Sequence, residues 1–542
     1  MLAPLFNFPV LMFLAALPLM WACAAMLRAL PERTRAATVL PLLSTAALVL
    51  AAALVGQLVF ASMYLGTPTF TDHIEPNTAV VAWLYAQGGQ LYHAIDAPER
   101  YSFLYGPVPY IASAWMYKLL GASTLAAKLP GFICLLIAIV FVVLSVRRRL
   151  PGQWLSCLVA LGYMALIALF FKNHSFWSKP DPFMIAASAI GLYSCLMWPG
   201  RKAWVLCGLA LGIAVNAKVT GAVYFLPYLA WFMERDSYRG PFVVLLTAAV
   251  VALLPFLFVD QVSILNYVAW LQSAGGHGLS QLLLLQNLVF MIFLLLPASF
   301  FLLWQAGSVG TRSWFITHKL VVAATVLATL LIWIAASKAG SGPHHLLPFL
   351  PPLAFLTAYA ASRVHAYKPA TKWNVYGFWA PVAAFIVAAS VKAGIALYYG
   401  IRVVMSQANA AAIVDDLVAI MDAHPDSNIY MGYGDGSTYP VSFVRHELVY
   451  AGNPYLVDAA AITDFQFSGV GIPQATIDAL ITDEQAIWLI PAGQQPFTMV
   501  NWYVRNSGGQ LFDTEFQSAF NDHFSRQATT DFFDLYVPAV KR

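Results

Sequence analysis

Four carboxylates gather in one stretch of this chain, residues 71–110, which stands between two long apolar runs. Asp72 and Glu75 lie three residues apart in TDHIEP, and Asp96 and Glu99 follow in HAIDAPER. A positioned carboxylate can take the proton from an attacking hydroxyl group, and such acid–base groups typically contribute about 10²–10⁴-fold to a rate. We therefore take Asp72 as the first candidate base and Glu75 as the second.

Structural roles compete with a catalytic role for these acids. Asp favours helix starts, and Pro76 suits a first helical position, so Asp72 is also explained as an ordinary helix-start acid. Asp96 and Glu99 suit solvated loop positions. Asp181 in SKPDP is explained either as the cap of the next helix or as a contact to an acceptor or to Lys179.

Cationic side chains occupy other polar breaks between apolar runs, HSFWSKPDP, NAKVTG and SKAGSGPHH. Cations stabilise negative charge on a departing group, and neighbouring glycines let the backbone approach a ligand. A lysine near a helix end can instead reach out to the lipid headgroups, and the histidine pair lacks the nearby carboxylates of a typical metal site, so we expect no metal. The candidates are Lys179, Lys218, Lys338, His344 and His345, with Arg100 as an outlier.

The elements that position these residues are membrane helices. Of the 542 residues 60% are hydrophobic and 10% charged, and the mean hydropathy is +0.70, which is typical of a polytopic α-helical membrane protein. A span needs roughly 20 mainly apolar residues. About twelve spans are expected, at 8–30, 37–63, 124–146, 153–171, 182–199, 203–217, 219–233, 241–259, 283–304, 320–337, 346–361 and 374–398. Residues 203–233 form either two short helices that meet at Lys218 or one long bent helix.

Basic residues occupy every second loop, which the positive-inside rule places in the cytoplasm. Both chain ends and all the candidate site residues are then expected outside. The loop 64–123 is too long for a simple connection, and AVVAWLYAQ and VPYIASAWMYKLL within it resemble interfacial helices. Its repeated aromatics are expected mainly as belt residues at the membrane interface: Trp83, Tyr85, Tyr92, Tyr101, Tyr105 and Tyr110.

The character of the chain changes near residue 401. AAIVDDLVAIMDAH has helical periodicity, while NIYMGYG and AIWLIPAG read as short buried strands that end in glycine turns. We expect residues 1–400 to form a transmembrane module that includes the external loop 64–123. Residues 401–542 are expected to form a soluble extracytoplasmic α/β domain.

The order of motifs between residues 37 and 361 resembles the membrane glycosyltransferases of the GT-C type. The acidic D-x-x-E loop is followed by GGQLY, YGPVPY and LLGASTLAAKLPG, then by HSFWSKPDP, NAKVTG and SKAGSGPHHLLPFLPPLA. The set is similar in particular to the branch of the protein O-mannosyltransferases and lipid A aminoarabinose transferases. That family commonly has an adjacent Asp-Glu pair, whereas here the two acids are three residues apart.

The resemblance implies a GT-C fold and an external active site in the inner (plasma) membrane. It also implies inverting transfer of a sugar from a polyprenyl-phosphate donor to a lipid or glycan acceptor, with no cofactor and no nucleic acid. Asp72 or Glu75 would be the base. The donor phosphate would contact Lys338, His344, His345 and Lys218, and the acceptor loop would contain Lys179, Asp181, Arg100 and Tyr105. A lipid-linked oligosaccharide ligase or polymerase and a membrane transporter stay open as alternatives.

Overall fold

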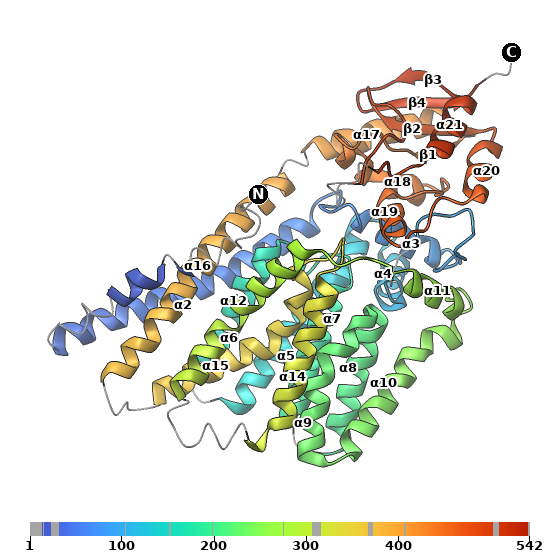
Figure 1. Cartoon of the computed structure of the whole chain (residues 1–542). Helices are drawn as coiled ribbons and strands as arrows, with labels where there is room; N and C mark the ends of the chain where they lie inside the picture. Colours follow the sequence, from blue (N-terminus) through green and yellow to red (C-terminus); the bar gives the residue numbers. More distant parts are fainter. Residues whose placement is uncertain are drawn as a thin grey trace. The chain divides into compact units, whose positions relative to one another are not determined.

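The computed structural model of the chain is shown in Figure 1. It describes residues 13–14, 16–22, 32–102, 105–150, 153–197, 199–274, 276–305, 316–366, 372–405, 408–501 and 509–539. The chain divides into two compact units. The helical unit consists of Met1–Met63, Gly131–Leu253 and Leu279–Ile401, and the mixed unit consists of Tyr64–Pro130, Leu254–Gly278 and Arg402–Arg542.

The helical unit is built from long apolar helices joined by short polar breaks. The elements that lie wholly or mainly in it are α2 (Glu32–Leu65), α5 (Thr124–Arg149), α6 (Gln153–Ala168), η1 (Leu169–Phe171), α7 (Asp181–Leu196), α8 (Arg201–Ala217), η2 (Val219–Phe225), α9 (Leu226–Asp236), α10 (Arg239–Phe258), α12 (Gln281–Gln305), α14 (Lys319–Ala336), η3 (Pro343–Phe349), α15 (Leu350–Ala366) and α16 (Lys372–Met405).

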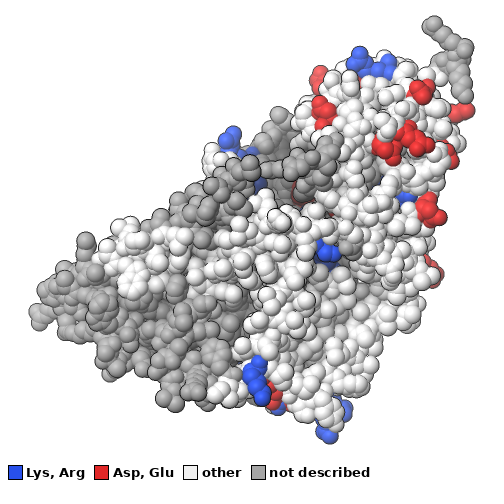
Figure 2. Space-filling model, viewed as in Figure 1, with Lys and Arg blue, Asp and Glu red and all other residues white. Residues whose placement is uncertain are grey.

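Seven stretches of the described chain are long and apolar enough to cross a membrane. They are Ser44–Leu65, Thr124–Arg149, Gln153–Phe171, Arg239–Phe258, Gln281–Ala298, Lys319–Ala336 and Pro381–Ala423. The polytopic helical class is therefore confirmed, while the count of twelve is not. Most of the predicted span 8–30 lies outside the described residues. On the face seen in Figure 2, a broad surface over the helices is free of charged side chains, as lipid contact requires.

The polar break at Lys218 separates two helices, which decides between the two alternatives for residues 203–233. α8 ends at Ala217, and Lys218 has an extended backbone with φ −158° and ψ 136°. The chain then continues through η2 into α9. Gly221 allows this reversal, because a Cβ there would lie 2.2 Å from the carbonyl oxygen of Ala214 in the last turn of α8.

The mixed unit combines short helices with one small sheet. Its elements are α3 (Glu75–Ala86), α4 (Pro107–Leu120), α11 (Ile264–Ala274), α17 (Ala408–Ala423), β1 (Asn428–Met431), η4 (Tyr439–Val444), α18 (Arg445–Tyr450), α19 (Ala459–Phe467), α20 (Gln474–Thr482), β2 (Ala486–Pro491), α21 (Thr514–His523), β3 (Phe524–Thr529) and β4 (Phe533–Pro538).

The sheet has the strand order β1-β2-β4-β3. β1 and β2 pair in parallel with Ile429 opposite Ile487, and β4 runs antiparallel to both β2 and β3. All six residues of β2 are buried, as its continuous apolar sequence predicts for a central strand. The two predicted strands, NIYMGYG and AIWLIPAG, are therefore present as β1 and β2.

One hydrophobic core runs through the mixed unit and joins segments that are far apart in the sequence. It includes Tyr92 and Tyr110 from the loop, Trp270 from α11, and Trp488 and Phe497 from the C-terminal segment. α3 packs on both α4 and α18 (Figure 1). The domain boundary near residue 400 stays a prediction, and within this unit the loop and the C-terminal segment bury their apolar side chains together.

Candidate active site

Glu75 is the buried anchor of a tight turn between α2 and α3. It is the first residue of α3 and is fully buried. Its carboxylate accepts hydrogen bonds from the hydroxyl of Tyr64 and, at 3.2 Å each, from the backbone N–H and the hydroxyl of Thr71. A buried carboxylate is tolerated only with such donors. Through these contacts Glu75 stabilises the turn between α2 and α3.

Asp72 lies in the same turn and is more accessible. Its side chain is 26% exposed, whereas Glu75 is 0% exposed. One carboxylate oxygen accepts a hydrogen bond from the backbone N–H of Ile74 at 3.0 Å. The other lies 3.6 Å from Nδ1 of His73. The turn therefore fixes Asp72 from its own backbone, and the side chain stays partly exposed.

Lys128, which the sequence analysis did not assign to the site, fixes the chain that leads into this turn. Its side chain is fully buried. Its Nζ lies 2.7 Å from the hydroxyl of Thr67, and 2.7, 2.9 and 3.0 Å from the carbonyl oxygens of Thr69, Thr67 and Tyr64. A lone lysine inside the apolar run STLAAKLPG was the signal, because an ionisable residue within a span marks a function or a partner by default.

The predicted loop HSFWSKPDP folds into a compact group of side chains in the helical unit. The indole N–H of Trp177 donates to Asp181 at 3.0 Å. Nζ of Lys179 lies 3.7 Å from the centre of the Trp177 ring, and the ring of His174 stacks on that indole at 3.6 Å. Lys179 and Asp181 are both buried. Trp177 therefore contacts both Lys179 and Asp181, the two residues of this loop that the sequence suggested. Trp177 itself was not predicted as a site residue.

The Lys218 break and the histidine pair meet within the same unit. Nζ of Lys218 lies 3.3 Å from Nε2 of His345, and the hydroxyl of Tyr224 donates to the His345 carbonyl oxygen at 2.6 Å. The His344 ring lies 4.6 Å from that of His345 and 5.0 Å from that of His174. Three of the predicted side chains, Lys218, His344 and His345, therefore lie close together although Lys218 is far from the histidine pair in the sequence.

His345 is held neutral in this surrounding. Burial lowers the pKa of its imidazole well below the usual 6.5, and the charges of Lys218, His344, His174 and Lys179 lower it further. Because the Lys218 ammonium can only donate, Nε2 acts as the acceptor and Nδ1 carries the proton. Among the described residues Nδ1 has no hydrogen-bond partner. The imidazole therefore offers an N–H donor on the side of the ring away from Lys218, and such a donor is suited to an anionic oxygen.

The other predicted site residues lie elsewhere. Lys338 stands in the turn after α14, where its backbone pairs with that of Leu279. Arg100 is buried in the mixed unit, and burial lowers its pKa to about 10 against the raising effect of Asp96 and Glu99. The carbonyl oxygen of Tyr105 accepts a hydrogen bond from Tyr92 at 2.7 Å.

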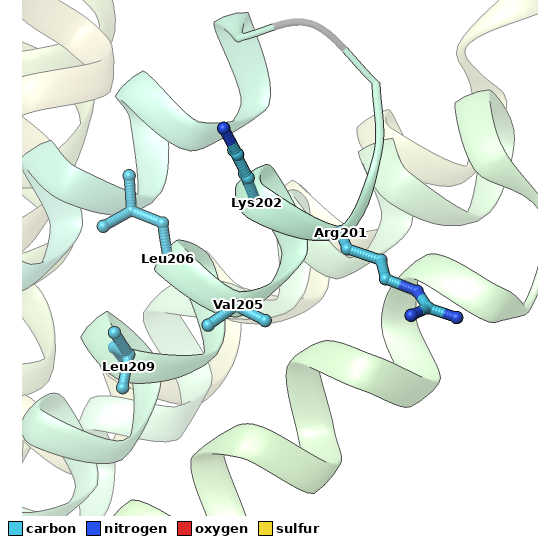
Figure 3. A pocket seen from close by; sticks show the side chains of 5 residues that line it. All are labelled: Arg201, Lys202, Val205, Leu206 and Leu209. Atoms are coloured by element: carbon cyan, nitrogen blue, oxygen red, sulfur yellow. The ribbon is translucent and has the colours of Figure 1, made fainter.

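A groove of about 380 Å³ lies apart from all these residues. It follows the first turns of α8 and is lined by Arg201, Lys202, Val205, Leu206 and Leu209 (Figure 3). None of the predicted site residues lines it. Within the described ranges, no three His, Cys, Asp or Glu side chains are grouped closely enough to hold a metal ion.

Comparison with known proteins finds a family similarity over part of the chain and a similar fold over most of it. Residues 105–259 match the sequence model of the dolichyl-phosphate-mannose-protein mannosyltransferases. Crystal structures of ArnT from Cupriavidus metallidurans, in the apo state and bound to undecaprenyl phosphate, are similar over 90% of this chain and 97% of that chain, with a TM-score of 0.51 and 14% identity.

A second likeness is weaker. The oligosaccharyltransferase AglB from Archaeoglobus fulgidus gives a TM-score of 0.46 at 10% identity, over 81% of this chain and 69% of that chain. No curated protein matches the sequence. The matched family segment contains Lys128, Lys179, Asp181 and Lys218, and the ArnT-like fold extends over nearly the whole chain. Together these findings show that the chain has a fold similar to that of ArnT, and that its residues 105–259 are similar to the dolichyl-phosphate-mannose-protein mannosyltransferases.

Proposed function

We propose that this enzyme transfers a sugar from a polyprenyl-phosphate donor to a hydroxyl group of a lipid or glycan acceptor on the extracytoplasmic side of the membrane, with inversion. The observation that carries the proposal is the gathering of Lys218, His345 and His344 in one partly buried cluster. The ArnT structure with bound undecaprenyl phosphate supports the same class of donor.

The cluster suits a phosphate that leaves the sugar. In the proposed step the acceptor oxygen attacks the anomeric carbon from the face opposite the phosphate, and the bond from that carbon to the phosphate oxygen breaks. The electron pair stays on the phosphate. Lys218 and the Nδ1–H of His345 stabilise the resulting negative charge, and preorganised donors of this kind are worth most where water is excluded. A phosphate leaves without obligatory help from a general acid.

Asp72 is the proposed base. It takes the proton of the acceptor hydroxyl as the new glycosidic bond forms, so the charge lost from the carboxylate appears on the phosphate. The contacts of Glu75 favour this division of roles, since Tyr64 and Thr71 already occupy its oxygens. Partial exposure and support from the Ile74 N–H leave Asp72 ready to accept a proton. We propose Lys179, Asp181, Arg100 and Tyr105 as the acceptor-side residues, and Lys338 and His344 as further phosphate contacts.

Purified protein incubated with radiolabelled polyprenyl-phosphate sugars and a membrane lipid extract tests the proposal. We expect label to pass to a new lipid or glycan product and free polyprenyl phosphate to accumulate in equal amount. A ligase or polymerase would instead consume only a lipid-linked oligosaccharide. A transporter would move the labelled lipid across a vesicle without forming a new product.

A further inference from the structure

A buried ion pair of the C-terminal segment reaches the turn that carries Asp72. Arg445, the first residue of α18, and Asp458, which precedes α19, are both fully buried. Nε and Nη2 of Arg445 each lie 2.7 Å from Oδ2 of Asp458. The same Nη2 donates to the carbonyl oxygen of His73 at 2.7 Å. The guanidinium therefore joins Asp458 directly to the His73–Ile74 peptide, whose N–H donates to the Asp72 carboxylate.

The partners of the pair are themselves fixed. Oδ1 of Asp458 accepts the backbone N–H groups of Ala460 and Ala461 at 2.9 and 3.0 Å, which anchors it at the start of α19. Nη1 of Arg445 donates to the Ser442 carbonyl oxygen at 3.0 Å. Each nitrogen of the guanidinium therefore contacts an acceptor. Arginine can serve several acceptors in this way because its guanidinium group is planar and carries five N–H donors in a fixed geometry.

His73 is held from a second direction as well. The ring of Tyr439 lies 6.2 Å from the imidazole of His73, and Nδ1 of that imidazole is 3.6 Å from the Asp72 carboxylate. The backbone of His73 is thus fixed by Arg445 while its side chain is enclosed between Tyr439 and Asp72. Any shift of the guanidinium would move the His73–Ile74 peptide, whose N–H holds the carboxylate of the proposed base.

We propose that Arg445, held by Asp458, is a positioning residue that sets the orientation of Asp72 during transfer. The proposal rests on the proposed function, in which Asp72 is the base. It gives the C-terminal segment a direct part in the reaction. A displacement of about 1 Å in a reacting group can cost on the order of 10²-fold in rate, so the loss of one of these contacts is large enough to measure.

A double-mutant cycle of Arg445→Lys and Asp72→Asn tests it. The lysine keeps a charge for Asp458 but cannot serve Asp458 and the His73 carbonyl with a planar fork. Alone, we expect it to lower kcat by about 10- to 10²-fold while donor binding stays within about twofold. In the Asp72→Asn background it should cause no further loss, because the group that it positions is gone. Arg526→Met is the matched control, since Arg526 is 57% exposed and lies on β3.

The outcomes separate the two proposals. Equal losses from Arg445→Lys in both backgrounds, or a loss in donor binding rather than in kcat, would overturn the positioning role and leave the proposed function intact. Full activity of Asp72→Asn would overturn the positioning role together with the assignment of Asp72 as the base. If Arg445→Lys does not fold, the paired change Arg445→Met with Asp458→Asn keeps the α19 cap and removes both charges, a replacement that buried pairs often tolerate. If neither variant folds, the Arg445–Asp458 pair is needed for the folding of the whole unit, and the specific role in positioning Asp72 is rejected.

Discussion

Asp72 and Glu75 lie three residues apart, and we propose different tasks for them because their surroundings differ. The fully buried carboxylate of Glu75 accepts hydrogen bonds from Tyr64 and Thr71. Asp72 is supported by the Ile74 N–H and stays partly exposed. Proton transfer requires a basic atom that an acceptor can reach, so accessibility favours Asp72.

Asp72→Asn should therefore reduce transfer by about 10²-fold or more while expression and donor binding stay close to those of the wild type. The amide keeps the size and the hydrogen bond but removes the basicity. Glu75→Gln should retain more activity and lose thermal stability instead, because the uncharged amide is a weaker acceptor for the three groups of Tyr64 and Thr71 that donate to it. Initial rates and thermal unfolding of both purified variants measure this. If Asp72→Asn is active and Glu75→Gln is dead, the roles are reversed.

The cationic cluster makes a second prediction at this scale. Lys218→Met and His345→Gln should each lower turnover by about 10²–10³-fold, the usual effect of removing one donor from an oxyanion site. Lys338→Ala and His344→Ala test the two further residues proposed for the same phosphate. Lys202→Met in the first turn of α8, the helix that ends directly before Lys218, is the control, because Lys202 is exposed. Normal turnover of Lys218→Met and His345→Gln in folded protein would reject this cluster as the phosphate site.

The depressed pKa of His345 predicts a dependence of stability on pH. Below the usual His pKa of about 6.5 the unfolded chain takes up a proton that the folded His345 does not. The stability of the native protein should fall by up to about 1.4 kcal/mol per pH unit as the pH drops below that value. His345→Gln should lack this slope. The difference in unfolding free energy between wild type and variant, followed from pH 7.5 to pH 5, measures it; parallel curves would contradict a neutral, buried His345.

At the scale of elements, close backbone packing sets the loop that carries Trp177, Lys179 and Asp181. A Cβ at Gly131 on α5 would lie 2.1 Å from the Trp177 carbonyl oxygen, a distance that no rotation of a side chain can relieve. The loop and the helix therefore need glycine at this position. The matched position for comparison is Gly394 in α16, where an added Cβ meets nothing within 4 Å.

Gly131→Ala should displace this loop and lower both the thermal stability and the affinity for the donor. The expected loss of stability is about 1–3 kcal/mol, as for other cases of forced overpacking. Gly394→Ala should stay within about 0.5 kcal/mol of the wild type. Thermal unfolding in detergent and a donor-binding assay compare the two alanines. Equal stability and equal donor affinity of the two variants would show that the loop can shift to accommodate the added methyl group at little cost.

At the scale of the whole molecule, hydropathy and charge correctly predicted a polytopic helical membrane protein, but they did not predict which side chains pack together. The Lys218 break was visible because polar residues interrupt two apolar runs. Tyr92 and Tyr110 were expected at the membrane interface but lie in the core of the mixed unit, since an aromatic ring with one polar atom suits either place. β3 was not predicted, because five of its six residues are exposed and show no alternation. The contacts of Trp177 and Lys128 depend on tertiary structure that spacing alone does not contain.

The membrane topology is the last prediction, and it rests on the basic loops that alternate along the chain. Residues 64–123 and 401–542 should face the outside, and the Arg147–Arg149 loop should face the cytoplasm. In a cysteine-free background, Asp96→Cys and Glu484→Cys should react with a membrane-impermeant maleimide in intact cells, because both positions are exposed. Gln153→Cys, also exposed, should react only after the membrane is permeabilised. Protection of either external position while Gln153→Cys is labelled would invert the arrangement and move the proposed reaction to the cytoplasmic face.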